Sequence, residues 1–196
     1  MMIHGLEKIR SVAVYCASTL PDDPAYAEAT AELARFIARH RMTLVFGGAD
    51  SGLMKILADT ALEHGAKVVG VFAEDLPEEI LHPGLTESFV ARNLAERKAL
   101  MLSRADALIG LPGSFGTWDE LFDALVRRKI GSRSCHAPIG VLNVNGYFDH
   151  LLAFIEHSVA TGITPESFRY LLKAGKTPEE LFRQFALELT LQHTTL

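Results

Sequence analysis

Short apolar runs alternate with longer amphipathic segments along the chain. Residues 9–17, 43–46 and 67–72 are rich in β-branched and aromatic side chains, the composition of strands buried in a parallel sheet. Residues 24–40 begin with a proline and repeat apolar side chains at helical spacing. The other predicted elements are strands at 87–90, 107–111, 138–143 and 170–172 and helices at 52–63, 93–104, 118–126, 148–160 and 178–191.

This order of elements predicts an α/β protein. Strands that alternate with helices of ten or more residues form βαβ units, which gives a doubly wound, mainly parallel sheet with helices on both faces. No linker divides the chain, so we expect a single domain over residues 1–196, with its core at about 9–191. Ligands of such sheets bind beyond the carboxyl ends of the strands. Three loops should reach that edge, those that contain Ser18, Gly48 and residues 112–117.

The turn at residues 112–117 joins a buried strand to a helix and contains two glycines. Such a turn presents unpaired N–H groups at the positive end of the helix dipole, which is a site for an anion, most often phosphate. A structural interpretation is equally open, because Thr117 and Glu120 have the spacing of a capping box. Spacing alone does not choose between them.

The charge and composition of the chain indicate which classes of partner and site are not expected. The net charge is −5 and 22% of the residues are charged, so we expect no nucleic-acid partner. Cys16 and Cys135 lie far apart and the eight histidines are scattered, which indicates neither a disulfide framework nor a metal site. No apolar run approaches the length of a membrane span and no signal core is present, so we expect no membrane partner and a cytoplasmic location. The glycine spacing matches neither a dinucleotide fingerprint nor a P-loop.

Two adjacent cations, Arg97 and Lys98, interrupt an otherwise apolar line on the helix at 93–104. Their charged ends can extend to solvent while their stems pack on the protein. An arginine near an anion site can instead bind a phosphate or a carboxylate with two hydrogen bonds, or fix a catalytic carboxylate.

Three segments of the chain are F-G-G-A-D-S-G-L-M at 46–54, E-R-K-A-L-M at 96–101 and P-G-S-F-G-T-W-D-E at 112–120. Together they resemble the LOG family of cytokinin riboside 5′-monophosphate phosphoribohydrolases. The family signature is P-G-G-x-G-T-x-x-E, with R-K and a G-G-x-x-x-G-L-M loop upstream. The resemblance implies a Rossmann-like fold, a homodimer with sites near the subunit interface, and neither a metal nor an organic cofactor.

The resemblance also implies roles for individual residues. Arg97 and Glu120 match the catalytic pair, and Lys98 and Glu79 match positions that the family uses for substrate. The residues that would bind the phosphate and the rest of the substrate are Gly113, Ser114, Phe115, Gly116 and Thr117, with Gly48 and Ser18 from the neighbouring loops. Ser114 stands where the signature has its second glycine. If that position requires a positive φ, serine is costly there, although its hydroxyl could donate to the phosphate.

The implied reaction is hydrolysis of the N-glycosidic bond of adenosine monophosphate or a cytokinin riboside 5′-monophosphate, which yields free base and ribose 5-phosphate. A carboxylate suits this chemistry, because it stabilises the positive charge that develops on the sugar and can activate water. The alternative is a non-catalytic nucleotide or molybdenum-cofactor carrier of the same fold. A different phosphosugar-handling enzyme would share only the phosphate site.

Overall fold

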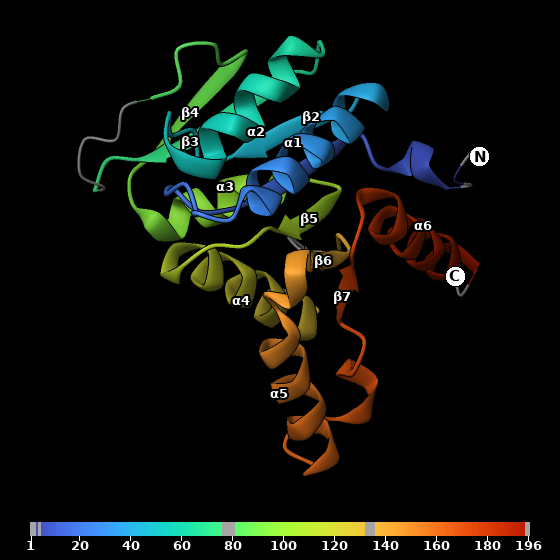
Figure 1. Cartoon of the computed structure of the whole chain (residues 1–196). Helices are drawn as coiled ribbons and strands as arrows, with labels where there is room; N and C mark the ends of the chain where they lie inside the picture. Colours follow the sequence, from blue (N-terminus) through green and yellow to red (C-terminus); the bar gives the residue numbers. More distant parts are fainter. Residues whose placement is uncertain (1–2, 4, 76–80, 132–135, 195–196) are drawn as a thin grey trace.

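The computed structural model describes residues 3, 5–75, 81–131 and 136–194. Within these residues, seven strands form one parallel sheet in the order β4-β3-β2-β1-β5-β6-β7 (Figure 1). The strands are β1 Ser11–Tyr15, β2 Thr43–Phe46, β3 Val68–Ala73, β4 Glu87–Ala91, β5 Ala107–Gly110, β6 Ile139–Leu142 and β7 Leu172–Gly175. The predicted α/β class and Rossmann-like sheet are confirmed, and the described strands are parallel throughout.

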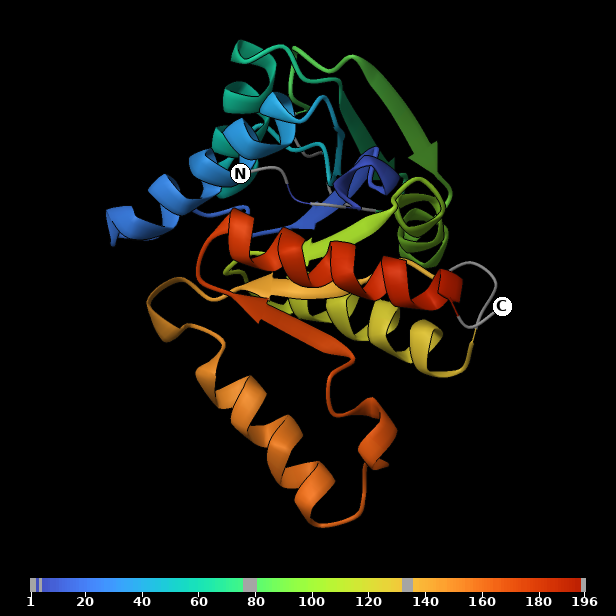
Figure 2. The same cartoon turned by 90° about the vertical axis from the view of Figure 1, so that its right-hand side faces the viewer.

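Helices cover both faces of the sheet (Figure 2). Those on one face are α1 Pro24–Arg39, α2 Gly52–Glu63 and α6 Pro178–Thr194. Those on the other are α3 Leu94–Ser103, α4 Phe115–Lys129 and α5 Asp149–Ala160. Short 3₁₀ helices lie at Leu6–Lys8, Val144–Gly146 and Glu166–Phe168. Within the described residues, none of the helices combines the length and the apolar character that a membrane crossing requires.

The two faces have separate cores. On the first face the rings of Phe36 and Phe182 stack with centroids 4.6 Å apart, which joins α1 to α6. On the second face Leu121 of α4 packs with Tyr15 and Leu108 from the central strands. Strands covered on both sides must be apolar at nearly every position, which is why the central runs show no alternation of apolar and polar residues.

Several predicted boundaries differ from the structure, and the starts of α4 and β7 are wrong. Helix α4 begins at Phe115, three residues before the predicted start, because the chain already turns at Ser114, whose carbonyl accepts a hydrogen bond from the Trp118 N–H at 3.0 Å. Strand β7 begins at Leu172, where pairing with Ile139 starts, whereas Tyr170 is exposed. All described strands belong to one sheet, and the extent of the domain stays a prediction.

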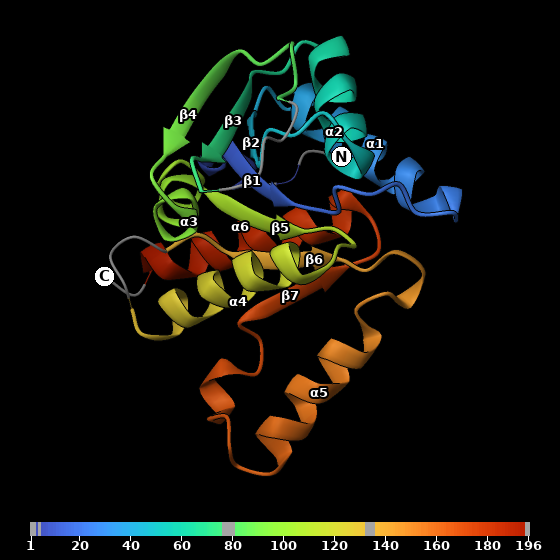
Figure 3. The ribbon, with the colours of Figure 1, turned by 90° about the vertical axis from the view of Figure 1, so that its left-hand side faces the viewer.

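The sheet order places a switch point between β1 and β5, where the chain winds toward opposite edges. Hydrogen bonds from the Leu111 N–H to the Tyr15 carbonyl (2.8 Å) and from the Ala17 N–H to the Pro112 carbonyl (3.2 Å) continue the pairing beyond the strand ends. The loops after β1 and β5 therefore leave the sheet together. In Figure 3 the start of α4 lies at this edge, while α5 extends away from the sheet.

Candidate active site

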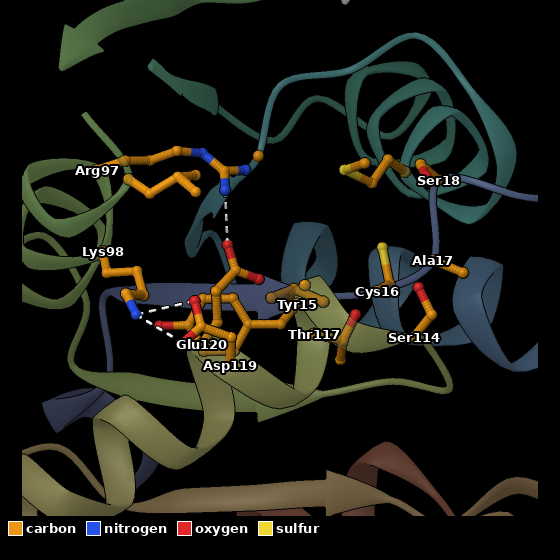
Figure 4. A pocket seen from close by; sticks show the side chains of 15 residues that line it. Tyr15, Cys16, Ala17, Ser18, Arg97, Lys98, Ser114, Thr117, Asp119 and Glu120 are labelled. Carbon is orange, nitrogen blue, oxygen red and sulfur yellow. Dashed lines mark hydrogen bonds and ion pairs between the residues drawn. The ribbon is translucent and has the colours of Figure 1, made fainter. Parts of the chain in front are cut away.

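A cavity of about 230 Å³ opens at the switch point. Its walls come from the end of β1, the loop after β2, α2, α3 and the first two turns of α4 (Figure 4). The side chains of Ser18, Ser114 and Thr117 lie at one end, and Arg97 and Glu120 lie at the other. The site is therefore where a doubly wound sheet places ligands.

Arg97 and Glu120 form an ion pair between α3 and α4. Nη1 of Arg97 donates to Oε1 of Glu120 at 2.9 Å, and Nε of Arg97 donates to the Val71 carbonyl at 2.8 Å. The side chains are only 11% and 10% exposed, so the two opposite charges offset part of each other's desolvation cost. The prediction that these two residues act as a pair agrees with this contact, and the Val71 carbonyl within β3 helps to orient the guanidinium.

The glycine loop after β2 leaves room for this arginine. A Cβ atom on Gly47 would lie 2.4 Å from Nη2 of Arg97, so any side chain there would displace the guanidinium from its present position. Gly48 has a different role, because its φ of +87° favours glycine and its carbonyl accepts a hydrogen bond from the His82 N–H at 3.0 Å. Gly48 is not one of the described residues that line the cavity, although it supports the loop that does.

The turn before α4 is extended at Ser114, where φ is −105° and ψ is −152°. Any L-residue adopts this conformation, so serine at the glycine position of the signature causes no backbone strain. Gly113 is different, because a Cβ there would lie 2.1 Å from Oγ1 of Thr117. Gly113 is thus needed for close packing of the turn against the helix, and it lies just outside the described lining of the cavity.

The capping-box interpretation of Thr117 and Glu120 is wrong. Helix α4 starts at Phe115, so Thr117 is already its third residue, and the N-cap position belongs to Ser114, which makes no side-chain capping bond. Glu120 pairs with Arg97 instead of turning back to the helix start. Ser114 therefore does not cap the N–H groups of the first turn, and within the described residues these donors can bind an anion.

Gly116 lines the cavity, and apart from its chain neighbours and the backbone of its own helix no atom of the described chain lies within 4 Å of a Cβ built on it. No contact in the described part of the chain therefore demands glycine there. Glycine at a helix start that faces open space instead lets another molecule approach the backbone closely.

Lys98 lies on the cavity wall, but its ammonium group is already paired. Nζ lies 2.8 Å from both carboxylate oxygens of Asp119, and 4.0 Å from Oδ1 of Asp123. Lys98 and Asp119 therefore join α3 to α4 at the cavity wall, where Figure 4 shows them beside Arg97 and Glu120. Contact of Lys98 with substrate stays a prediction.

The three remaining predicted site residues, Ser18, Phe115 and Glu79, differ in where the structure places them. Ser18 lines the cavity. Phe115 is 80% exposed, and its ring packs edge-on against Trp118 with centroids 5.0 Å apart, so it is not part of the described lining. Glu79 lies outside the described residues.

Sequence reasoning missed several lining residues, namely Cys16, Gly47, Met54, Leu94 and Asp119. Asp119 and Gly47 lie inside segments that carry the family resemblance, so those segments were the available signal. Cys16 carries no such signal. Burial, and then the nearby Glu120 carboxylate, raise the pKa of its thiol, which keeps it protonated and unreactive.

Comparison with known proteins identifies the family. A family model described as "possible lysine decarboxylase" matches residues 54–185. A cytokinin riboside 5′-monophosphate phosphoribohydrolase of Rhodococcoides fascians is 41% identical over 159 residues, which are 80% of this chain and 79% of that protein. The chain belongs to the LOG family. A LOG protein of Arabidopsis thaliana with the same activity in its name is 33% identical over 178 residues, 90% of this chain and 81% of that protein.

LOG-like folds also occur in proteins with other names. The molybdenum cofactor binding protein of Rippkaea orientalis superposes with a TM-score of 0.63 at 17% identity, over 94% of this chain and 96% of that one. The Moco carrier protein of Chlamydomonas reinhardtii gives a TM-score of 0.66 at 18% identity, over 92% and 97%. Identities this low establish a shared fold and nothing about ligands.

Proposed function

We propose that this LOG-family chain hydrolyses the N-glycosidic bond of nucleoside 5′-monophosphates and releases free base and ribose 5-phosphate. Adenosine monophosphate and its N6-modified cytokinin counterparts are the expected substrates, which would give the protein a role in cytokinin biosynthesis. The observation that carries the proposal is the buried Arg97–Glu120 pair at a cavity that also holds the start of α4. The names of the relatives at 33–41% identity support the same reaction.

The phosphate would bind at the start of α4. Free N–H groups of the first turn and the hydroxyls of Ser114 and Thr117 supply donors, and the helix dipole favours a negative charge there. Glu120 follows Thr117 by three residues, about 4.5 Å along the helix axis, which suits the distance from a 5′-phosphate to its ribose. Phosphate binding energy then positions the sugar for reaction.

Glu120 would act at the anomeric carbon. As the bond between C1 and the base nitrogen breaks, its electron pair leaves with the base and positive charge develops on the sugar, which the carboxylate stabilises. A water molecule attacks C1, and the same carboxylate orients it or accepts its proton. Arg97 holds the carboxylate in place through the 2.9 Å hydrogen bond, or contacts the nucleotide directly.

The carrier interpretation predicts binding without hydrolysis. A carrier has no need for a buried arginine–glutamate pair in its cavity, so retention of Arg97 and Glu120 favours the enzyme. Glu120→Gln separates the two, because it removes the charge and keeps the size of the side chain. The exposed Glu63 at the end of α2 offers a matched control, Glu63→Gln.

The test is incubation with adenosine monophosphate and N6-modified derivatives, with base release followed by chromatography. We expect the protein and Glu63→Gln to release base, and Glu120→Gln to be slower by about 100-fold or more. The affinity of Glu120→Gln for ribose 5-phosphate should change by no more than about threefold. Absence of base release from every purine and pyrimidine monophosphate would contradict the proposal.

The family resemblance also leads us to propose a homodimer, formed through an apolar stripe on α4. We define this stripe as Phe115, Trp118, Phe122 and Val126, whose side chains are 80%, 38%, 46% and 56% exposed. Their spacing of three, four and four residues places them on one face of the helix. An exposed apolar stripe of this kind is typical of an interaction surface.

The cytoplasmic location expected from the sequence stays a prediction.

The surface beside the stripe supports the same interface. An apolar groove of about 200 Å³ lies between α4 and α5 and is lined in part by Leu125, Ile155 and Phe154, which is 65% exposed. Because Phe115 and Trp118 lie in the first turn of α4, next to the cavity-lining Gly116 and Thr117, a partner packed on this stripe would lie close to the cavity.

A further inference from the structure

The loop between β6 and α5 contacts the turn that would hold the phosphate. The hydroxyl of Tyr147 donates a hydrogen bond to the Gly113 carbonyl at 2.5 Å, across 34 residues of sequence. We propose that Tyr147 is a positioning residue that aims the N–H group of Ser114 at the substrate phosphate. The proposal rests on the phosphate site of the proposed function and assigns a role to a residue outside the family signature.

The argument starts from the geometry of one peptide unit. The bond between Gly113 and Ser114 is trans, so the carbonyl of Gly113 and the N–H of Ser114 point to opposite sides of the chain. The carbonyl is held by Tyr147, and Ser114 lines the cavity. The N–H is therefore directed away from Tyr147, toward the cavity side of the turn.

Tyr147 is itself firmly placed. Its ring packs edge-on against Tyr26, with centroids 6.1 Å apart, and against Phe148 at 4.9 Å. Two residues before it, Asn145 adopts a φ of +49°, and its side-chain amide donates to Asp23 at 2.9 Å. One side of the loop is thus hydrogen-bonded to the N-cap residue of α1, and the other side packs on the core of the second sheet face. These contacts hold the Tyr147 hydroxyl in place.

A fixed peptide plane matters because the donors at a helix start work best when they need no rearrangement on binding. Ser114 makes no capping bond of its own that would hold this plane. Without the Tyr147 hydroxyl, the Gly113–Ser114 peptide can rotate, and part of the phosphate binding energy is lost to restoring its orientation. The phosphate is bound equally in the ground state and in the transition state, so the loss should appear in KM and not in kcat.

The test is Tyr147→Phe, which keeps the ring contacts and removes only the hydroxyl. We expect KM for adenosine monophosphate and the dissociation constant of ribose 5-phosphate, measured by calorimetry, to rise together by about tenfold. The value of kcat should stay within about twofold. Tyr26→Phe is the matched control, because the hydroxyl of this neighbouring ring makes no hydrogen bond within the described part of the chain.

The outcomes separate this proposal from the proposed function. If the unaltered protein hydrolyses nucleotide and Tyr147→Phe binds ribose 5-phosphate as tightly, the role of Tyr147 is overturned and the enzyme assignment stands. If the unaltered protein releases no base but Tyr147→Phe weakens ribose 5-phosphate binding tenfold and Tyr26→Phe does not, the role of Tyr147 is supported and the enzyme assignment fails. Equal weakening in both variants, or a fall in kcat at constant KM, would also overturn the role of Tyr147.

Discussion

Nη1 of Arg97 lies 2.9 Å from Oε1 of Glu120, although the two residues belong to different helices and lie 23 positions apart. Both side chains are nearly buried, at 11% and 10% exposure. The pair therefore links the proposed chemistry to the stability of the α3–α4 contact, because removal of either residue takes away the ion-pair partner of a nearly buried charge.

This link predicts a non-additive pair of substitutions. Arg97→Ala and Glu120→Ala should each lower the free energy of unfolding by about 3 kcal/mol, because each removes the ion-pair partner of a nearly buried charge. The double variant should lose less than the sum of the two, by about 1–3 kcal/mol. Urea unfolding of the four proteins measures the difference. Strictly additive losses would mean that the pair contributes nothing as a pair.

Gly116→Ala should weaken the binding of ribose 5-phosphate without lowering the free energy of unfolding. Apart from its chain neighbours and the backbone of α4, the new methyl group meets no atom of the described chain within 4 Å. Alanine is also the better helix former, so the free energy of unfolding should stay equal or rise by up to about 1 kcal/mol. The same methyl group would occupy space needed by a phosphate at the helix start. We expect the affinity for ribose 5-phosphate to fall at least about tenfold. A variant that binds as tightly as the original chain would place the phosphate elsewhere.

Acid should weaken a contact beside the glycine loop. Burial alone would raise the pKa of Asp59, but hydrogen bonds from His82 at 2.9 Å and from Lys55 outweigh it and hold the pKa below its ordinary value of 3.8. A carboxylate with a depressed pKa in the folded state contributes stability above the unfolded value and loses it as the pH falls through the folded value. The contribution of Asp59 is therefore complete at neutral pH and disappears below 3.8.

Thermal unfolding of the original chain and of Asp59→Asn measures this effect. The original chain should be the more stable at about pH 6, and the difference should shrink toward about pH 3. Glu7→Gln, which removes an exposed carboxylate from the 3₁₀ helix at Leu6–Lys8, serves as the control for general acid destabilisation. A difference that stays constant over the whole range would exclude the Asp59 carboxylate as its source.

The apolar stripe on α4 should control self-association. Val126 is 56% exposed at the far end of the stripe, so Val126→Lys should place a charge in the proposed interface and shift the protein from dimer to monomer. Leu187→Lys is the control, since Leu187 is 62% exposed on α6, away from the stripe. Light scattering coupled to size exclusion gives the masses. An unaltered dimer in Val126→Lys would place the interface on another surface.

The general fold could be predicted because its signals are local. Residues 68–72 are apolar throughout, as strands covered on both faces of a sheet must nearly be, and this marks a parallel strand without any tertiary information. Arg97 and Glu120 were found because both lie in segments that resemble the LOG family. Their juxtaposition follows from the topology, since α3 and α4 flank β5 on the same face.

Other features depend on contacts that sequence spacing does not encode. The start of α4 was misplaced because Thr117 and Glu120 match a capping pattern, while packing and the Arg97 pair use these side chains differently. The Lys98–Asp119 pair joins two helices across 21 residues. The Tyr147–Gly113 hydrogen bond spans 34 residues, and the pattern of apolar and polar positions in the two segments does not predict it.

The extended backbone at Ser114, with φ at −105°, bears on how relatives of this chain are found. A search pattern that insists on two consecutive glycines after the proline would discard this protein, although its main chain follows a path open to any amino acid. Chains with alanine, threonine or asparagine at the same point can trace the same turn. Genome surveys should allow any residue at the position of Ser114 and still require glycine at Gly113, which packs against Thr117. Such surveys should recover members of the family that the stricter pattern rejects.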